Sequence, residues 1–365
     1  MRVDLLDYPL PDEAIAQEPA HDRDGARLLV VDGAGAWHRQ IRDWIELVPA
    51  GSLVVLNDTR VRRSRLQLRK STGGKVELLV LGVRPSEPGT EIWTALGHSN
   101  KPMRIGSRYE LGPLRLTLLG REPGGTLLLS ASGHGDAEAF FEQYGVVPLP
   151  PYIRRVAGDG DAERYQTVFA DQLGSAAAPT AGLHLTRVML DALALKGVEV
   201  AFTTLHVGAG TFMPVRTDDL DEHPMHAESY SVSSALADAV ARARERGARV
   251  IAVGTTVVRA LESAHDEQRP GCVLPCSGIT RLLIQPGYPF RVIDSLLTNF
   301  HAPRSTLIAL VSAFIGPRRL QAAYALALRE RYRFLSYGDA MWLPGVIAHD
   351  LGDGEPLPTP AAKAT

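Results

Sequence analysis

The sequence has little cysteine and no long apolar run. Cys272 and Cys276 are the only two cysteines among its 365 residues, and their C-x-x-x-C spacing fits neither a redox pair nor a zinc pair. Two thiols cannot make a disulfide framework, so we expect free thiols in a reducing cytoplasm. The longest apolar stretch, from Leu307 to Ile315, is too short to cross a bilayer, and the start of the chain has no signal-peptide pattern. These absences predict a cytoplasmic protein with no membrane segment.

The chain also lacks an excess of either charge. Its 39 basic and 41 acidic residues give a formal net charge of −2. A strongly basic protein would indicate a nucleic-acid partner directly, but a balanced one leaves RNA binding open, because phosphate contacts depend on where the positive charges lie. Hydrophobic residues make up 45% of the chain, which is enough for a large core, and the length favours two domains.

Three common ligand-binding motifs are missing. The chain has no G-x-G-x-x-G dinucleotide fingerprint, no G-x-x-x-x-G-K-[ST] phosphate loop and no G-x-S-x-G nucleophile elbow. Gly208-Ala209-Gly210 follows a predicted strand, but it is only G-x-G and gives weak evidence for a nucleotide. The sequence therefore argues against a P-loop, a dinucleotide site of the usual kind and an α/β-hydrolase.

The second half of the chain alternates between helical and strand patterns. Thr186 can cap a helix that Gly197 ends, and the alternating, β-branched segment 198–207 follows as a strand. A helix opened by Ser234 and closed by Gly247 precedes a strand over 248–253, and a strand over 290–300 precedes a helix from about Ser305 to 314. Together with an earlier strand over 52–56, these units predict an α/β main domain, built on a mixed sheet or barrel-like, with helices on its faces.

Between about residues 65 and 147 the pattern changes. The segments 75–83, 91–97, 114–120 and 126–132 are short, strand-like and separated by Gly, Pro and Ser, and a helical pattern returns only at 137–144. We therefore predict a small antiparallel β-barrel domain over 65–147. It is inserted into a discontinuous α/β catalytic domain of residues 1–64 and 148–349. Residues 350–365 are expected to form a flexible tail.

Polar residues follow each predicted strand of the main domain. The strand over 52–56 runs into Asn57-Asp58-Thr59-Arg60, and later strands run into 206–212, 254–256 and 299–301. Ligands of open α/β sheets bind at the carboxyl ends of strands, where glycine allows close approach and helix N-termini favour anionic groups. One such segment is adequately explained as a helix cap. Several at equivalent places predict a shared small-molecule pocket.

Four histidines lie in these polar segments or in the similar segment 178–184. Histidine transfers protons near neutral pH, although each one is equally well explained as a hydrogen-bonded structural side chain. The segment 223–228 resembles a metal-ligand cluster, but it lacks the helical spacing of H-E-x-x-H. We expect proton transfer by His184, His206, His226 and His301 and no metal, and keep as an alternative a metal-dependent hydrolase that uses His206, His223 and His226.

One stretch indicates a nucleic-acid surface. From Arg60 to Lys75 the chain carries seven basic residues and no acidic one. If this stretch is a strand, Leu66 and Leu68 face inward while the basic residues face outward. A solvated strand face explains the pattern equally well, and a non-catalytic RNA-binding protein is the second alternative. The residues expected to contact RNA are Arg62, Arg63, Arg65, Arg69 and Lys70.

Ten segments stand out in order along the chain. They are LNDTRV (56–61), GGKVELL (73–79), PLPPYI (148–153), YQTVFA (165–170), AAPTAGLH (177–184), TLHVGAGTF (204–212), HPMHAESY (223–230), VGTTVVRALES (253–263), TNFHAPRSTL (298–307) and FLSYGDAM (334–341). Taken together they resemble one family, the S-adenosylmethionine:tRNA ribosyltransferase-isomerases of queuosine biosynthesis. The resemblance extends from the start to about Leu343, with small departures such as Met213 where a Gln is usual.

The resemblance implies a transferase and a family fold of an α/β domain with an inserted β-barrel. The ribosyl part of S-adenosylmethionine would move to the aminomethyl group of 7-aminomethyl-7-deazaguanine at the tRNA wobble position. Isomerisation would give epoxyqueuosine, with release of adenine and methionine. The expected partner is a tRNA with a GUN anticodon. No metal or cofactor is implied, since S-adenosylmethionine is a consumed co-substrate, and we expect a monomer.

This chemistry needs at least two proton carriers, because one proton leaves the carbon beside the sulfonium and another reaches the departing adenine. The expected catalytic residues are His184, His206, His226, His301, Asp58 and Glu228. Aromatic side chains that can stack on the unstacked base are Tyr152, Tyr165 and Phe300. The expected substrate ligands are Arg60, Gly208, Gly210, Thr211, Gly254, Thr255, Thr256, Arg259, Asn299 and Asp339, with the two arginines suited to the methionine carboxylate or a tRNA phosphate.

Overall fold

A mixed sheet of nine strands forms the centre of the main domain. The computed structural model describes residues 1–70, 73–122, 125–208, 210 and 215–347. The strand order is β15-β13-β12-β3-β14-β16-β17-β1-β2, with β12, β3, β14 and β16 parallel to one another and antiparallel pairs toward both edges. The strands are β1 (Arg27–Asp32), β2 (Gly35–Gln40), β3 (Leu53–Asn57), β12 (Glu199–Leu205), β13 (Glu228–Val232), β14 (Val250–Val253), β15 (Cys276–Thr280), β16 (Ser295–Asn299) and β17 (Ala340–Leu343).

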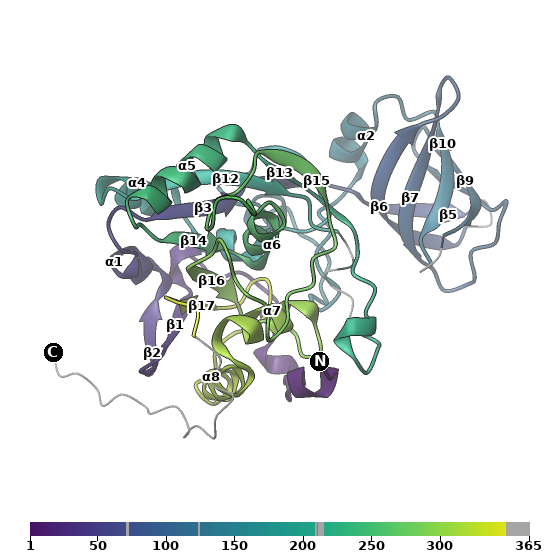
Figure 1. Cartoon of the computed structure of the whole chain (residues 1–365). Helices are drawn as coiled ribbons and strands as arrows, with labels where there is room; N and C mark the ends of the chain where they lie inside the picture. The colour runs from purple at the N-terminus through teal and green to yellow at the C-terminus, as the bar shows by residue number, and fades with distance from the viewer. Residues whose placement is uncertain (71–72, 123–124, 209, 211–214, 348–365) are drawn as a thin grey trace.

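Both faces of this sheet are buried. Along β3, Val55 belongs to one core cluster while Val54 and Leu56 belong to the other, as the two-residue period of a strand requires. One face packs against α5 (Ser234–Glu245), α6 (Thr255–Ser263), α7 (Thr306–Ile315) and α8 (Pro317–Arg329). The other face packs against α1 (Trp44–Leu47) and α4 (Arg187–Leu195) (Figure 1).

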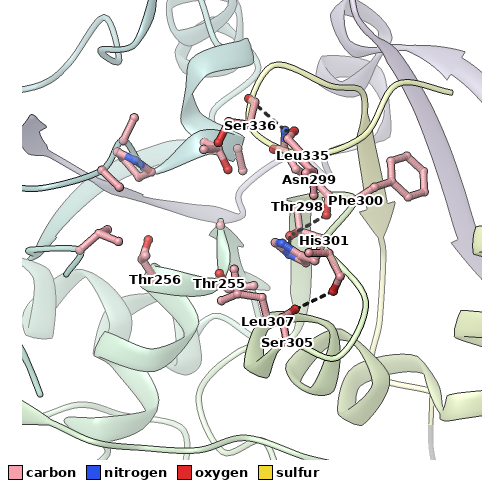
Figure 2. A pocket seen from close by; sticks show the side chains of 18 of the residues that line it. Thr255, Thr256, Thr298, Asn299, Phe300, His301, Ser305, Leu307, Leu335 and Ser336 are labelled. Carbon is pink, nitrogen blue, oxygen red and sulfur yellow. Dashed lines mark hydrogen bonds between the residues drawn. The ribbon is translucent and has the colours of Figure 1, made fainter. Parts of the chain in front are cut away.

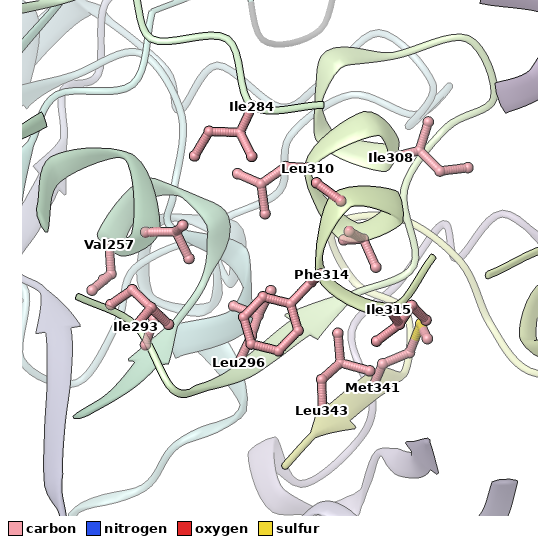
Figure 3. Close-up of a cluster of buried hydrophobic side chains, with 14 of the residues drawn as sticks. Val257, Ile284, Ile293, Leu296, Ile308, Leu310, Phe314, Ile315, Met341 and Leu343 are labelled. Carbon is pink, nitrogen blue, oxygen red and sulfur yellow. The ribbon is translucent and has the colours of Figure 1, made fainter. Parts of the chain in front are cut away.

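The apolar helix α7 fills the centre of the first face. Figure 3 shows Phe314 next to Leu296 of β16 and Ile315 next to Met341 and Leu343 of β17. Leu310 points toward Ile284, and Ile308 lies on the opposite side of the helix. All eight α7 residues from Ile308 to Ile315 are buried. An α-helix that is apolar all round is typical of a core position, so the nine-residue apolar run predicted as too short for a bilayer is a core helix. Within the described residues, no helix combines the length and apolarity of a membrane span.

A closed six-stranded antiparallel barrel projects from one side of the main domain (Figure 1). The predicted alternation is confirmed in its first strand, where Leu66 and Leu68 are buried and Gln67 and Arg69 are exposed. The barrel starts and ends at one place, because Arg65 and Val146 exchange two backbone hydrogen bonds. The order is β10-β7-β6-β5-β8-β9, with β5 (Arg65–Lys70), β6 (Lys75–Pro85), β7 (Thr90–His98), β8 (Arg108–Leu111), β9 (Leu114–Arg121) and β10 (Leu127–Ser132).

The remaining short elements connect the barrel to the main sheet. The helix α2 (Ala137–Tyr144) packs onto the barrel core, and the pair β4 (Thr59–Val61) and β11 (Gln172–Ser175) forms a separate two-stranded sheet. A short α3 (Asp161–Arg164) and a 3₁₀ helix over Thr180–His184 precede α4. The mixed sheet and the antiparallel barrel confirm the predicted fold class.

The predicted start of α5 at Ser234 is confirmed, and Ser233 before it caps the helix by accepting from the Leu236 N–H. The strand predicted over 290–300 is shorter, because β16 starts at Ser295. Before it, the N–H groups of residues 291–293 donate to the carboxylate of Glu262 instead of to a neighbouring strand.

The Glu262 carboxylate should be a main determinant of stability. It is 1% exposed and accepts from three backbone N–H groups and from the Tyr288 hydroxyl. Glu262→Ala leaves these donors buried without acceptors, so we expect a loss of about 3 kcal/mol in the free energy of unfolding. The measurement is urea unfolding, with the exposed Glu267→Ala as control. Equal midpoints for the two variants would show that water replaces the carboxylate without cost.

Candidate active site

A cavity of about 220 Å³ lies where the carboxyl ends of the parallel strands meet. Its wall comes from the segments that follow β12, β14 and β16, from residues 177–181 and from residues 335–336 (Figure 2). This confirms that polar segments distant in the sequence converge on one pocket. Its described lining includes no Asp, Glu, Lys or Arg side chain. The predicted site residues found in it are Gly254, Thr255, Thr256, Asn299 and His301.

The first turn of α6 forms one wall of this cavity. Gly254 precedes the helix with a φ of 95°, a conformation that a residue with a side chain rarely adopts. It turns the chain sharply from β14 into the helix, so Thr255 and Thr256 line the cavity. The helix has no side-chain cap, and the free N–H groups of a helix N-terminus favour negative charge.

Asn57, the last residue of β3, ties three parts of the site together. Its side-chain N–H groups donate to the Leu205 carbonyl at 2.9 Å and to the Thr256 hydroxyl at 3.1 Å. Its side-chain oxygen accepts from the backbone N–H groups of Thr59 and Leu205. Asn57 lies in one of the predicted polar segments but was not among the predicted site residues. Its place at the very end of a predicted strand is the sequence signal that could have identified it.

His301 and Asn299 stand on the opposite wall. His301 is buried, and its Nε2 lies 2.9 Å from the Thr298 hydroxyl oxygen (Figure 2). Burial lowers the pKa of His301 to about 3, so the ring is neutral at physiological pH. The Asn299 side-chain N–H donates to the Leu335 carbonyl at 3.0 Å, which joins the end of β16 to the loop before β17. Thr298 is a second residue that the sequence analysis missed.

His206 occupies a different environment beside the cavity. Its Nδ1 lies 2.8 Å from the hydroxyl oxygen of the buried Thr59, and its ring packs closely on Gly174. The ring is half-buried, and burial, with a smaller contribution from the Arg62 charge, lowers the pKa of His206. The neighbouring Val207 lines the cavity, whereas the His206 ring lies against Thr59 and Gly174 and is not part of the cavity lining.

A second, smaller cavity of about 30 Å³ shares the side chain of Leu307 with the first. Four predicted residues line it: Gly210, His226, Glu228 and Arg259. Arg259 and Glu228 form a buried ion pair, and the other Glu228 oxygen accepts from the Gly208 N–H at 3.0 Å. The exposed His226 ring lies so close to Gly210 that a Cβ on that glycine would overlap it.

His184 and Asp339 are not in either cavity. His184 lines a separate cavity of about 20 Å³ that meets the first at Ser336, and burial lowers its pKa to about 4, opposed in part by Asp339 and Asn299. Asp339 accepts hydrogen bonds from the Arg27 side chain and from the backbone N–H of Arg333. The Asp339 carboxylate therefore holds the chain segment before β17, and no contact to the main cavity supports its expected role as a substrate ligand.

Asp58 and Arg60 lie outside the main cavity as well. The pKa of Asp58 is raised by burial, and its carboxylate accepts from the Thr204 hydroxyl at 2.7 Å. Arg60 is exposed on β4. Thr211, Ala209 and Met213 fall outside the described residues.

Three of the seven basic residues of the stretch from Arg60 to Lys75 have partners at the junction between the barrel and the main domain. Arg62 pairs with Glu138 at 2.6 Å, and Arg63 lies 4.0 Å from Glu142. Arg65 donates to the Leu149 carbonyl at 2.8 Å. These three arginines stabilise the junction, while Arg69 is exposed on the barrel and Lys70 is in β5.

The three aromatic candidates differ in access. Tyr152 lines the main cavity, with its hydroxyl 2.6 Å from the Ser336 hydroxyl oxygen. Tyr165 is fully buried next to Tyr337, and the Phe300 ring packs among Tyr324, Tyr332 and Phe334. Figure 2 shows the Phe300 ring pointing away from the other labelled side chains. Stacking of a base on Tyr165 or Phe300 would require the core to open.

The residues of the metal-hydrolase alternative do not form one ligand group. His223 and His226 line the second cavity, whereas the His206 ring contacts Thr59 and Gly174. Over the described part of the chain, no cluster of three or more His, Cys, Asp or Glu side chains has the arrangement of a metal site. The geometry instead presents neutral imidazoles, hydroxyls and a helix N-terminus, which suits proton transfer on a small polar molecule.

Comparison with known proteins identifies what the chain is similar to. A family model described as queuosine biosynthesis protein matches residues 3–343. The S-adenosylmethionine:tRNA ribosyltransferase-isomerase of Sorangium cellulosum is 52% identical, covering 95% of this chain and 100% of that protein. The protein of the same name from Acidithiobacillus ferrooxidans is 51% identical, covering 92% and 95%.

A solved structure agrees with these matches. The crystal structure of an S-adenosylmethionine tRNA ribosyltransferase from Thermotoga maritima is 33% identical in sequence, with a TM-score of 0.53. The match covers 93% of this chain and 99% of that one. Similarity therefore extends through both the main domain and the barrel.

The two buried histidines should make stability depend on pH. The pKa values of His184 and His301, about 4 and about 3, lie below the ordinary value near 6.5. Below about pH 6.5 the unfolded chain therefore binds more protons than the folded one. The contribution of the two histidines to the free energy of unfolding is complete above about pH 6.5 and is lost as the pH falls toward their pKa values in the folded protein. The free energy of unfolding is measured with urea at pH 7 and at pH 5. We expect it to fall less from pH 7 to pH 5 in His301→Gln than in the unchanged protein. The fully exposed His21→Gln is the control, and equal losses in all three proteins would refute the assignment.

Proposed function

The chain belongs to the queuosine biosynthesis protein family and is an S-adenosylmethionine:tRNA ribosyltransferase-isomerase, and on this premise we propose its full reaction. It transfers the ribosyl group of S-adenosylmethionine to the aminomethyl nitrogen of 7-aminomethyl-7-deazaguanine at the wobble position of a tRNA with a GUN anticodon. It then isomerises the group, giving epoxyqueuosine, adenine and methionine. The enzyme acts as a cytoplasmic monomer and uses no metal or other cofactor.

The cavity at the strand ends is the observation on which this proposal rests. Its volume of about 220 Å³ and its lining of hydroxyl, amide and imidazole groups suit the nucleoside part of the donor. Thr255, Thr256 and Thr298 supply hydroxyls for ribose, and Asn299 supplies an amide. The described lining carries no ionic charge. During the reaction the positive sulfonium becomes the neutral sulfur of methionine, and a carboxylate paired with the sulfonium would stabilise the starting state and slow this step.

Departure of adenine is assisted by the first turn of α6. When the bond between ribose and adenine breaks, the base leaves with the electron pair and negative charge develops on its ring nitrogens. The free N–H groups at the start of α6 line the cavity and favour that charge without any need to reorganise. The departing base then takes up a proton from a side chain or water.

Proton transfer is assigned to His206 and His301. Both rings are neutral at physiological pH because burial lowers the pKa of each, so each can accept a proton as the reaction begins. His206 is half-buried on the segment after β12, next to the cavity-lining Val207, and would act on the amine of the incoming tRNA base. His301 is enclosed and faces the donor. His226 and Glu228, which line the second cavity, act on the methionine side.

The tRNA reaches the site along the side that carries the barrel. Arg60 on β4 and Arg69 on β5 are exposed basic residues near the start of the barrel, suited to phosphate contacts that position the anticodon loop. Arg62, Arg63 and Arg65 add positive potential there while they stabilise the junction. Tyr152 is the aromatic side chain in the cavity on which the unstacked base can lie.

Release of adenine tests the proposal directly. The purified protein is incubated with S-adenosylmethionine and with tRNA that carries 7-aminomethyl-7-deazaguanine, and adenine is measured by chromatography. We expect adenine in proportion to the modified tRNA, and none with the unmodified tRNA. A protein that binds the tRNA without releasing adenine would be a non-catalytic RNA-binding protein. Loss of activity after chelation, restored by a divalent metal, would support the hydrolase alternative.

The hydrogen bond between Thr59 and His206 should affect turnover and its pH dependence. Thr59→Val removes the hydroxyl next to Nδ1 and leaves the ring orientation and tautomer unfixed, while the buried volume is kept. We expect kcat to fall about tenfold, with KM for S-adenosylmethionine within about twofold and a shifted pH profile. Thr203→Val is the matched control, because that buried hydroxyl donates to the Ser231 carbonyl instead. Identical kinetics in both variants would exclude His206 as a proton carrier.

A further inference from the structure

We propose that the second cavity binds the amino-acid end of S-adenosylmethionine, with Arg259 holding its α-carboxylate and Glu228 its α-ammonium group. This assignment rests on the proposed function, since it names where one part of that donor lies. The observations behind it are a buried ion pair with an unused donor, an apolar wall, and the lining residue Leu307 that the second cavity shares with the main one.

Arg259 has a hydrogen-bonding group that the protein leaves unused. The residue is 7% exposed; its Nη1 donates to Glu228 and its Nε donates to the Leu282 carbonyl at 3.0 Å. Its Nη2 is buried and has no partner within the described residues. A buried guanidinium nitrogen without an acceptor is costly, and a ligand carboxylate in the cavity would satisfy it.

The charge pattern fits a zwitterion better than a simple anion. Glu228, 5% exposed, neutralises Arg259, so a phosphate with two negative charges would be repelled by the neighbouring carboxylate. An α-amino-acid head group carries one ammonium and one carboxylate on adjacent atoms. It can therefore pair its ammonium with Glu228 while its carboxylate accepts from Arg259.

The rest of the lining suits a short hydrocarbon chain. Leu282, Ile284, Leu307 and Leu310 form apolar walls, and the volume of about 30 Å³ admits a small group and excludes a nucleotide. The methionine part of the donor has this chemistry: methylene groups lead from the sulfonium to the charged head. A tRNA phosphate, by contrast, has no hydrocarbon chain to place against these apolar walls.

The two cavities are arranged so that one molecule can occupy both. Thr255 lines the main cavity and Arg259 the second, and they lie four residues apart, on one face of α6 and one helical turn of about 5.4 Å from each other. Leu307 borders both cavities. The sulfonium then lies at this boundary, with the nucleoside toward the first turn of α6 and the head group toward Arg259.

A donor that lacks the carboxylate tests this assignment. Adenine release is measured with the modified tRNA and either S-adenosylmethionine or decarboxylated S-adenosylmethionine. For the unchanged protein we expect a KM at least about tenfold higher for the decarboxylated donor. Arg259→Lys keeps a positive partner for Glu228 but lacks the second donor nitrogen. It should raise KM for S-adenosylmethionine about tenfold and leave KM for the decarboxylated donor within about twofold.

The matched control is Arg242→Lys, which alters an arginine whose ion pair with Glu199 is more exposed and lies on α5. It should change neither KM. If Arg259→Lys does not fold, product inhibition of the unchanged protein decides: methionine should compete with the donor, and 3-(methylthio)propylamine, which lacks the carboxylate, should not. Equal use of both donors, or equal inhibition by both products, overturns the assignment. Absence of adenine with either donor would instead refute the proposed function.

Discussion

The side chain of Asn57 is the constraint on which the site depends. It is buried, and each of its two polar atoms makes two hydrogen bonds. Through them the end of β3 fixes the end of β12 before His206, the backbone of Thr59, and the first turn of α6. A carboxamide is required, since a carboxylate could not donate to Leu205 and Thr256, and an apolar side chain would leave four buried groups unsatisfied. One side chain therefore sets the relative positions of the segment that leads to His206, the backbone of Thr59 and the N-terminus of α6.

Periodicity and end signals were sufficient to predict the fold class. The helix over Arg187–Leu195 is capped by Thr186 as predicted, and Leu66 and Leu68 point into the barrel because strand side chains alternate. The strand before Ser295 could not be delimited in this way. Its apolar pattern continues back to Phe290, but the backbone there bonds to Glu262, some thirty residues earlier. Such a side-chain acceptor has no local sequence signature.

The location of the candidate site could be predicted from the sequence, but the hydrogen-bond and ion-pair partners of its residues could not. Parallel strands bring their carboxyl ends to one edge, so the polar segments after β12, β14 and β16 had to converge. Which polar atoms hydrogen-bond to one another depends on the tertiary structure and has no local sequence pattern. Asp339 and Glu228 look alike as carboxylates in polar motifs, yet Asp339 is held by Arg27 and the Arg333 backbone, while Glu228 lines a cavity beside Arg259. The same limit applies to Arg62, Arg63 and Arg65, which a basic pattern marks but whose junction partners it does not reveal.

The closed base of the barrel has an evolutionary consequence. Arg65 and Val146 face each other across two backbone hydrogen bonds, so the roughly eighty residues between them leave and return at one point. Neither β3 nor the later strands of the main sheet change register when such a segment is gained, lost or exchanged. The sequence of the barrel can thus diverge at a different rate from that of the main domain, as long as its two ends still meet at Arg65 and Val146.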